Sequence, residues 1–316
     1  MSEALRWIAA DWGTSRLRIW GMGAGRGADA ALFARASDQG MARLAPGDYP
    51  AALTALLGDQ APGPGALLPV VVCGMAGAAG GWAEAGYGAL PWDAGQGAGS
   101  GFVRPDAGGD RFAPVILPGL AQTDPPDVMR GEETQIAGFI AANPGFTGTL
   151  ILPGTHSKWV TLDRGLVRGF RSFMTGEVFA ALTGATILRL TMPSDAPPDD
   201  ASDETFLGAV AAALDDPHLP LSDLFSLRAG ALLGHDPAPQ GRARLSGWLI
   251  GAEIAAARRA FDLGSPIALI GAGDLGARYR SALALAEIKA PLFDGEALVL
   301  DGLCAAYRNI FDGDPA

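Results

Sequence analysis

The sequence predicts an α/β protein with two domains, in which mixed sheets are flanked by helices. Short apolar runs of strand length alternate with stretches where apolar residues recur at helical spacing. A hairpin with a Gly-Thr turn occurs near the start, over residues 6–20, and again over residues 149–162. The breaker Asn143-Pro144-Gly145 separates the two copies, and 316 residues suffice for two domains of ordinary size.

The first hairpin carries a carboxylate at its mouth. An apolar run ends at Asp11, a polar turn follows, and from Leu17 apolar and polar residues alternate. Gly13 allows close approach of the backbone to a ligand, and Thr14 and Ser15 offer hydroxyl and N–H groups there. Because Asp11 and a phosphate are both anionic, Asp11 would hold a phosphate only through Mg²⁺. The alternative is an ordinary hairpin whose Asp and Thr satisfy the turn.

The rest of the first half predicts strands, one helix and a glycine-rich loop. The apolar run 67–73 is typical of an interior strand, and it leads into the loop 74–82. That loop is either a ligand-binding loop, as often follows a buried strand in α/β proteins, or a flexible connector. The other elements expected here are a strand at 30–36, a helix at 50–57, irregular loop over 91–113 and a strand at 115–117.

Two adjacent glutamates begin the last helix of the first half. The helical spacing of the apolar residues from Ile136 onward puts Glu132 and Glu133 in the first turn. Carboxylates are stabilised there by the helix dipole, which is one sufficient explanation for them. The other is that one glutamate is a general base, with Arg130 beside it to hold an anion.

The second half opens with a weaker copy of the first hairpin. Strands are expected at 149–152, 156–162 and 166–172, with the turn Pro153-Gly154-Thr155 after the first of them. Proline stands where the first copy has a turn-side acid, but the rare Lys158 follows. Lys158 would either neutralise phosphate charge or be a solvated strand residue. A repeated phosphate hairpin, one in each domain, is a more specific signal than either copy alone.

Helices dominate the remainder of the chain. Thr175 is expected to cap a helix that runs to about residue 188. Gly247 and Gly251 belong to a small-residue face on a later helix, which allows another backbone or a flat ligand to approach closely. The strand 267–270 leads into Gly271-Ala272-Gly273-Asp274, which we interpret as an adenosine-binding edge rather than a Rossmann site, because no second βαβ half can follow. The other expected elements are a Pro/Asp-rich linker at 192–203, helices near 203–214, 221–233 and 241–261, a strand at 291–293 and a helix at 296–311.

Composition narrows the possible partners and the compartment. A net charge of −11 with only two lysines argues against a nucleic-acid-binding or anionic-membrane surface, because both need clustered positive charge. Cys73 and Cys304 have no metal-site spacing and suit buried thiols in a reducing compartment. Asp11 interrupts the apolar stretch near the N-terminus, so a signal peptide is not expected. We therefore expect a cytoplasmic protein.

Five blocks of the chain carry a resemblance to a known family. They are Asp11–Ser15, Met129–Gln135, Leu152–Val160, Met174–Glu177 and Leu249–Glu253. In this order they look like the blocks of 2-dehydro-3-deoxygalactonokinases, within the actin–hexokinase–Hsp70 superfamily. The resemblance implies two ribonuclease H-like (actin-like ATPase) domains with an active-site cleft between them. It also implies ATP-dependent phosphorylation of the terminal hydroxyl of 2-dehydro-3-deoxygalactonate in galactonate breakdown, with Mg²⁺.

The resemblance also implies a domain division and a set of roles. Residues 1–144 would hold the substrate and the first phosphate turn, and residues 145–316 would hold the nucleotide. Glu133, favoured over Glu132, would be the base, and Asp11 would hold Mg²⁺. Phosphate binding is expected at Gly13, Thr14, Ser15, Gly154, Thr155 and Lys158, substrate binding at Arg16, Gly74, Met75, Gly77 and Arg130, and adenosine binding at Gly271, Gly273 and Asp274.

Two other functions stay open. The same fold would serve a kinase for another sugar acid, such as 2-dehydro-3-deoxygluconate, and a substrate-independent ATPase switch is a third reading. The expected partners are therefore a small sugar acid and ATP, with no nucleic acid and no membrane, and a homodimer is compatible with the sequence.

Overall fold

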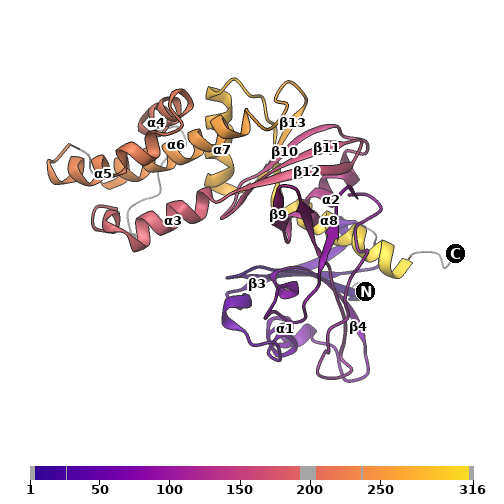
Figure 1. Ribbon diagram of the computed structural model, residues 1–316. Helices are drawn as coiled ribbons and strands as arrows, with labels where there is room; N and C mark the ends of the chain where they lie inside the picture. Colours follow the sequence, from indigo (N-terminus) through magenta and orange to yellow (C-terminus); the bar gives the residue numbers. More distant parts are fainter. Residues whose placement is uncertain (1–3, 26, 193–203, 236–237, 313–316) are drawn as a thin grey trace. The chain divides into compact units, whose positions relative to one another are not determined.

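The computed structural model describes residues 4–25, 27–192, 204–235 and 238–312 (Figure 1). They form two compact units. The first comprises residues up to 146 together with 163–169 and 295 onward, and the second comprises 147–162 and 170–294. The predicted linker lies, from residue 193 on, outside the described residues.

The first unit is built on a five-stranded mixed sheet. Its order is β3-β2-β1-β4-β7, in which β1 pairs antiparallel with β2 and parallel with β4. These strands are β1 (Trp7–Trp12), β2 (Leu17–Met22), β3 (Ala31–Ser37), β4 (Leu68–Gly74) and β7 (Phe112–Ile116). The hairpin, the third strand and the interior strand predicted from the sequence are all present.

The second unit repeats this sheet. Its order is β14-β13-β10-β11-β12, in which β10 pairs antiparallel with β11 and parallel with β13, as β1 does with its two neighbours. These strands are β10 (Gly148–Leu152), β11 (Ser157–Asp163), β12 (Leu166–Phe173), β13 (Ile267–Gly271) and β14 (Leu292–Asp294). The internal repeat read from the two hairpins therefore extends to whole sheets.

Two helices pack together over the sheet of the first unit. They are α2 (Glu132–Ala142) and α8 (Gly295–Tyr307). A Cβ built on Gly138 would lie 2.0 Å from the Leu298 carbonyl oxygen, and one on Gly302 would lie 1.9 Å from that of Thr134. Because glycine alone permits this approach, the last helix packs into the first unit, whereas the sequence assigned it to a domain of residues 145–316.

Smaller elements complete the first unit. The helix α1 (Tyr49–Leu57) packs against side chains of the five-stranded sheet. A second, three-stranded sheet has the order β5-β8-β9. The start of β12, at residues 166–167, belongs to the first unit and pairs there with β6. The strands are β5 (Tyr87–Ala89), β6 (Trp92–Asp93), β8 (Gly119–Thr123) and β9 (Pro126–Met129), with single helical turns at Ala28–Ala30, Met41–Arg43, Gly58–Gln60, Met75–Gly77 and Arg308–Asp312.

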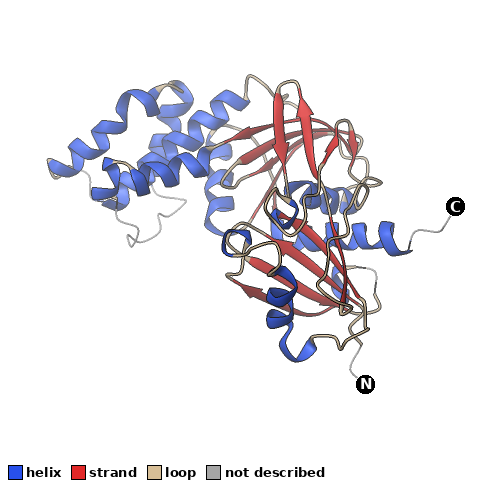
Figure 2. Ribbon diagram, turned by 60° about the horizontal axis from the view of Figure 1, so that its bottom comes forward, coloured by secondary structure: helices blue, strands red, loops and turns tan. Residues whose placement is uncertain are grey.

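The second unit carries a separate group of helices, seen as blue coils beside its strands (Figure 2). The small-residue face of α6 packs on α4, where a Cβ on Gly247 would lie 2.4 Å from the Phe206 carbonyl oxygen. Of the two close approaches that this face allows, by another backbone or by a flat ligand, the structure has the backbone of α4. The helices are α3 (Thr175–Ala185), α4 (Glu204–Asp215), α5 (Leu219–Leu232), α6 (Ala238–Ala257) and α7 (Gly273–Leu285), with a helical turn at Ile187–Leu190.

One local prediction is wrong. Thr175 is the first residue of α3, and Met174 is its N-cap, without a side-chain cap hydrogen bond. The Thr175 hydroxyl instead donates to the carboxylate of Glu253, so a tertiary partner replaces the local one. Among the described helices, none has the length and hydropathy that a bilayer crossing requires.

Candidate functional site

The turn between β1 and β2 exposes its hydroxyl groups. Gly13 N–H donates to the Arg16 carbonyl at 2.8 Å and closes the turn. The carbonyls of Gly13 and Thr14 accept from the backbone of the segment at 41–42, which fixes the turn from behind. Thr14 and Ser15 are exposed, so the predicted phosphate-binding residues are available to a ligand.

Asp11 is held by Arg18, a residue to which the sequence-based prediction gave no role. Asp11 and Arg18 are directly opposite in the register of β1 and β2. Arg18 Nη2 lies 2.5 Å from Asp11 Oδ2, and Arg18 Nη1 lies 2.9 Å from a carboxylate oxygen of Glu296 on α8. The signal for Arg18 was its place opposite an acid in a predicted hairpin, where opposite charges attract.

Glu133 is a buried carboxylate at the start of α2. Glu133 is 4% exposed. Its carboxylate accepts hydrogen bonds from Gly131 N–H at 2.7 Å and from the Thr134 hydroxyl at 3.2 Å. Burial, followed by the charge of neighbouring Glu132, raises the pKa of Glu133 to about 8. The carboxylate of Glu132 instead accepts from Arg130 N–H at 3.0 Å. The two adjacent glutamates therefore differ in environment.

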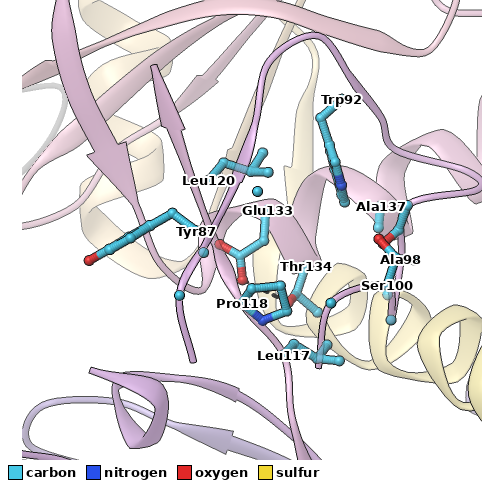
Figure 3. Close-up of a pocket in the computed structure, with 17 residues that line it drawn as sticks. Tyr87, Trp92, Ala98, Ser100, Leu117, Pro118, Leu120, Glu133, Thr134 and Ala137 are labelled. Atoms are coloured by element: carbon cyan, nitrogen blue, oxygen red, sulfur yellow. Dashed lines mark hydrogen bonds between the residues drawn. The ribbon is translucent and has the colours of Figure 1, made fainter. Parts of the chain in front are cut away.

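Glu133 lines a cavity of about 220 Å³ within the first unit. Figure 3 shows Glu133 and Thr134 next to each other, with Trp92, Leu120 and Pro118 around them. Most of the wall comes from residues 86–101, and the part from residue 91 on belongs to the predicted irregular loop 91–113. The lining residues are Gly86, Tyr87, Gly88, Trp92, Gly97, Ala98, Gly99, Ser100, Gly101, Leu117, Pro118, Gly119, Leu120, Glu133, Thr134, Ala137 and Gly302.

The predicted substrate loop is not part of the wall of this cavity. Gly74, Met75 and Gly77 are not among the lining residues. Gly74 has a φ of +86°, and a Cβ there would lie 2.7 Å from the Trp12 carbonyl oxygen. Gly131 has a φ of +107°, and a Cβ built on it would lie 3.6 Å from the Gly74 Cα. The two glycines thus bring the ends of β1 and β4 close to the start of α2.

Asp11 and Glu133 flank one buried thiol. Cys73 Sγ lies 3.8 Å from Asp11 Oδ1. Burial raises the pKa of Cys73, and the charges of both Asp11 and Glu133 raise it further. The predicted metal-binding acid and the predicted base are therefore neighbours within the first unit.

Arg130 has donor groups that the described residues do not satisfy. Its Nη2 donates to the Gly86 carbonyl at 3.2 Å, and its guanidinium carbon lies 4.4 Å from the ring centroid of Tyr87. Nε and Nη1 are buried and have no hydrogen-bond partner in the described part of the chain. A Cβ on Gly77 would lie 2.8 Å from Nη1, so Gly77 leaves room for this guanidinium. Such an arrangement suits a planar anion, whereas Arg16 is exposed.

The second turn is held by the start of α3. Glu177 N–H donates to the Thr155 carbonyl at 2.9 Å, and His156 Nε2 lies 2.6 Å from Glu177 Oε2. Lys158 is 3% exposed and its Nζ donates to the His156 carbonyl at 3.2 Å. The reading of Lys158 as a solvated strand residue is therefore wrong.

A second cavity, of about 280 Å³, lies within the second unit. Two of the predicted nucleotide-site residues, Gly154 and Asp274, line it, whereas Gly271 and Gly273 do not. Arg242 and Arg278 carry no local signal in the sequence, because their cationic side chains come to this cavity only through the packing of α6 against α7. The lining residues are Gly154, Thr175, Gly176, Phe179, Arg242, Ser246, Leu249, Ile250, Asp274, Leu275, Arg278 and Tyr279.

A pre-built metal cage is absent from the residues that the structure describes, since no three His, Cys, Asp or Glu side chains converge there. A single carboxylate is nevertheless a suitable donor set for Mg²⁺, which usually keeps several waters and binds substrate phosphates. Asp11 fits that requirement with Oδ1, because Arg18 occupies Oδ2 and the contact of Oδ1 with the Cys73 thiol, at 3.8 Å, is weak.

The chain is similar in sequence and structure to proteins named as kinases of 2-dehydro-3-deoxygalactonate. The family model described as 2-keto-3-deoxy-galactonokinase matches residues 11–306. A Rhizobium meliloti protein provisionally named 2-dehydro-3-deoxygalactonokinase is 41% identical over 98% of this chain and 99% of its own. The Escherichia coli protein named 2-dehydro-3-deoxygalactonokinase is 35% identical over 88% of this chain and 89% of its own. A crystal structure from Sinorhizobium meliloti, with the same provisional name, superposes with a TM-score of 0.86 at 40% identity, covering 96% of this chain and 99% of that one.

Proposed function

The chain belongs to the 2-keto-3-deoxy-galactonokinase family and has the fold of the actin-like sugar kinases, and we propose that it is a 2-dehydro-3-deoxygalactonokinase. The reaction transfers the γ-phosphoryl group of ATP to the terminal, 6-hydroxyl of 2-dehydro-3-deoxy-D-galactonate. Its products are ADP and 2-dehydro-3-deoxy-6-phosphogalactonate. The observation that supports this most strongly is the buried carboxylate of Glu133 in the wall of a cavity.

Glu133 is assigned the role of general base. The attacking hydroxyl must lose its proton as its oxygen bonds to phosphorus, and a carboxylate with a pKa near the working pH accepts a proton efficiently. Glu132 is a weaker candidate, because it does not line the cavity and its carboxylate is engaged by the Arg130 backbone.

Arg130 is assigned to the carboxylate of the sugar acid. A guanidinium can hold a carboxylate through two parallel hydrogen bonds, and the two buried donors of Arg130 lack partners among the described residues. Its neighbours Gly86 and Tyr87 line the cavity that contains Glu133. Arg16 is the alternative site for the same group. Gly74 lies next to Gly131 at the start of α2 and Gly77 leaves room for Arg130, whereas a substrate contact of Met75 stays a prediction.

ATP is assigned to the two turns and to the cavity of the second unit. Gly13, Thr14 and Ser15 of the first turn, and Gly154 and Thr155 of the second, offer backbone N–H and hydroxyl groups to phosphate oxygens. Lys158 adds a buried positive charge. The adenosine would lie beside Asp274, with Gly271 and Gly273 shaping the start of α7.

Mg²⁺ is assigned to Asp11 through Oδ1 and water, since Oδ1 is contacted by the Cys73 thiol at 3.8 Å and not by Arg18. Bound there, the ion would neutralise phosphate charge during transfer. Arg18 fixes the Asp11 carboxylate through its other oxygen.

We also propose that the protein is cytoplasmic, because both of its cysteines are buried free thiols, as is usual in a reducing compartment.

The test is an ADP-release assay with Mg²⁺, ATP and 2-dehydro-3-deoxygalactonate, in which the phosphorylated product is identified by mass spectrometry. We expect ADP and the phosphorylated acid in equal amounts, and no ADP above background when the acid is omitted. ADP release without any acceptor would instead support the ATPase switch, and release only with another sugar acid would support the second kinase reading.

A further inference from the structure

A buried carboxylate that the mechanism does not use lies in the core of the second unit. Glu253 is on α6 and is 3% exposed. Its Oε1 accepts from Trp159 Nε1 at 2.8 Å, and its Oε2 accepts from the Tyr279 hydroxyl at 2.7 Å. The Thr175 hydroxyl donates to the same Oε2. One side chain thus joins β11, α3 and α7.

The network continues from Tyr279 to the residue that follows the second turn. Ser157 Oγ lies 2.8 Å from the Tyr279 hydroxyl, and both groups are buried. Because an ionised carboxylate only accepts, Tyr279 donates to Glu253, and Ser157 therefore donates to Tyr279. The hydrogen bonds run in one direction, from Ser157 through Tyr279 to Glu253. Burial raises the pKa of Glu253, while the hydrogen bonds from its donors lower it.

The ends of this network lie at the nucleotide cavity. Thr175 and Tyr279 both line it. Ser157 begins β11 directly after the turn that contains Gly154 and Thr155, and Trp159 follows on the same face of the strand, two residues on. Glu253 itself does not line the cavity, so it acts on a ligand only through these neighbours.

Simple satisfaction of buried polar groups does not account for a carboxylate here. Burying an ionisable group is costly, and a neutral acceptor would serve the single N–H of Trp159. A carboxylate is needed where one oxygen must accept from two hydroxyls while the other accepts from an indole. Both of those hydroxyls belong to residues of the cavity wall.

We propose that Glu253 is a positioning residue for the nucleotide: through Tyr279, Ser157 and Thr175 it fixes the second phosphate turn relative to the wall of the nucleotide cavity. This inference rests on the proposed function in assigning that cavity to ATP. Loss of the network should let the turn, together with α3, shift relative to α6 and α7, which weakens nucleotide binding while leaving the sugar-acid site in the first unit intact.

The decisive variant is Tyr279→Phe, because it removes both hydroxyl bonds and keeps the ring. We expect the Kd for MgADP, measured by calorimetry, and the KM for ATP to rise roughly tenfold, as suits hydrogen bonds to a charged group. The KM for the sugar acid should stay within about twofold of wild type, because the substitution changes no residue of the proposed sugar-acid site. Tyr49→Phe is the matched control, because the Tyr49 hydroxyl is buried without a partner among the described residues and lies in the other unit.

A mutant cycle separates positioning from a purely structural role. Ser157→Ala alone should weaken MgADP binding, but it should add little in the Tyr279→Phe background, where its partner is already gone. Glu253→Gln, which keeps one acceptor, should bind MgADP more tightly than Glu253→Ala. A lowered melting temperature for Tyr279→Phe with an unchanged Kd for MgADP would overturn the inference.

The same titrations distinguish this inference from the proposed function. If wild-type protein binds MgADP but phosphorylates no sugar acid, the proposed function is wrong and the effect of Tyr279→Phe on binding still decides the inference. If wild-type protein binds no MgADP, the nucleotide cavity and the inference are both overturned.

Discussion

Asp11 and Arg18 are opposite each other on β1 and β2, with Arg18 Nη2 2.5 Å from Asp11 Oδ2. Arg18 also contacts Glu296, from α8, so the last helix of the chain helps to orient the first carboxylate. Arg18 uses one oxygen of Asp11, and the weak contact of Oδ1 with the Cys73 thiol, at 3.8 Å, leaves that oxygen to a cation. The contact between Arg18 and Glu296 thus links the first turn to a segment almost 280 residues further along the chain.

Asp11→Asn should weaken the dependence of activity on Mg²⁺. An amide is a poorer ligand for this hard cation than a carboxylate, so the Mg²⁺ concentration for half-maximal rate should rise roughly tenfold or more. Titration of Mg²⁺ at fixed ATP measures this. Asp38→Asn is the matched control, because Asp38 also pairs with an arginine, Arg43, but on an exposed surface. Identical titrations for wild type and Asp11→Asn would show that Asp11 does not bind the metal.

Glu133→Gln should lower kcat by roughly 10²–10⁴-fold with little change in the Kd for MgADP, because it removes a proton acceptor and preserves shape. Glu132→Gln is the control and should have a smaller effect, since Glu132 does not line the cavity. Full activity in Glu133→Gln would exclude the assignment.

The pH profile checks the same assignment independently. Because burial raises the pKa of Glu133 to about 8, the base form is scarce at neutral pH, and wild-type kcat should rise up to about pH 8. The folded protein binds this proton more tightly than the unfolded chain does, so the group's contribution to stability falls as pH rises from about 4.5 to 8. Glu133→Gln should lose both dependences, which rate profiles and thermal melts at several pH values would show.

Arg130→Gln should raise the KM for the sugar acid by roughly 10- to 100-fold, the range expected for loss of a charged hydrogen bond to a carboxylate. Arg16→Gln should have a much smaller effect, because Arg16 is exposed. Steady-state kinetics with the sugar acid varied at saturating ATP would separate the two. A larger effect for Arg16→Gln would move the carboxylate site to the first turn.

Gly247→Ala should destabilise the second unit by about 1–3 kcal/mol, since its Cβ would lie 2.4 Å from a backbone oxygen of α4. Gly208→Ala, in α4 itself, is the matched control: its Cβ would meet nothing within 4 Å, and the change should stabilise the helix by about 0.5–1 kcal/mol. Urea denaturation with a probe in the second unit measures both. Equal stability of the two variants would refute the close α4–α6 contact.

The elements that the sequence predicted well are those with a local signal. The two hairpins follow from alternation of apolar residues beside Gly-Thr turns, and the first turn of α2 follows from the helical spacing after Glu133. Gly247 and Gly251 predicted a close approach by another backbone or a flat ligand, because only small residues permit one, and the structure has the backbone of α4. In each case a few neighbouring residues carry the information.

The features that the sequence did not reveal depend on distant contacts. The wall of the Glu133 cavity comes from residues 86–101, which have no periodicity and take their shape from what they pack on. The return of α8 to the first unit depends on Gly138 and Gly302, some 160 residues apart in the chain. Thr175 was expected to cap α3, but Glu253 competes for its hydroxyl through tertiary packing.

The most direct test compares two epimeric substrates. The kcat/KM for ADP release should be measured with 2-dehydro-3-deoxygalactonate and with its gluconate epimer, under the same Mg²⁺ and ATP concentrations. The account predicts efficient turnover of the galactonate derivative, with a clearly higher kcat/KM than for the epimer. No acid-dependent ADP release from the galactonate derivative, or a higher kcat/KM for the epimer, would contradict it.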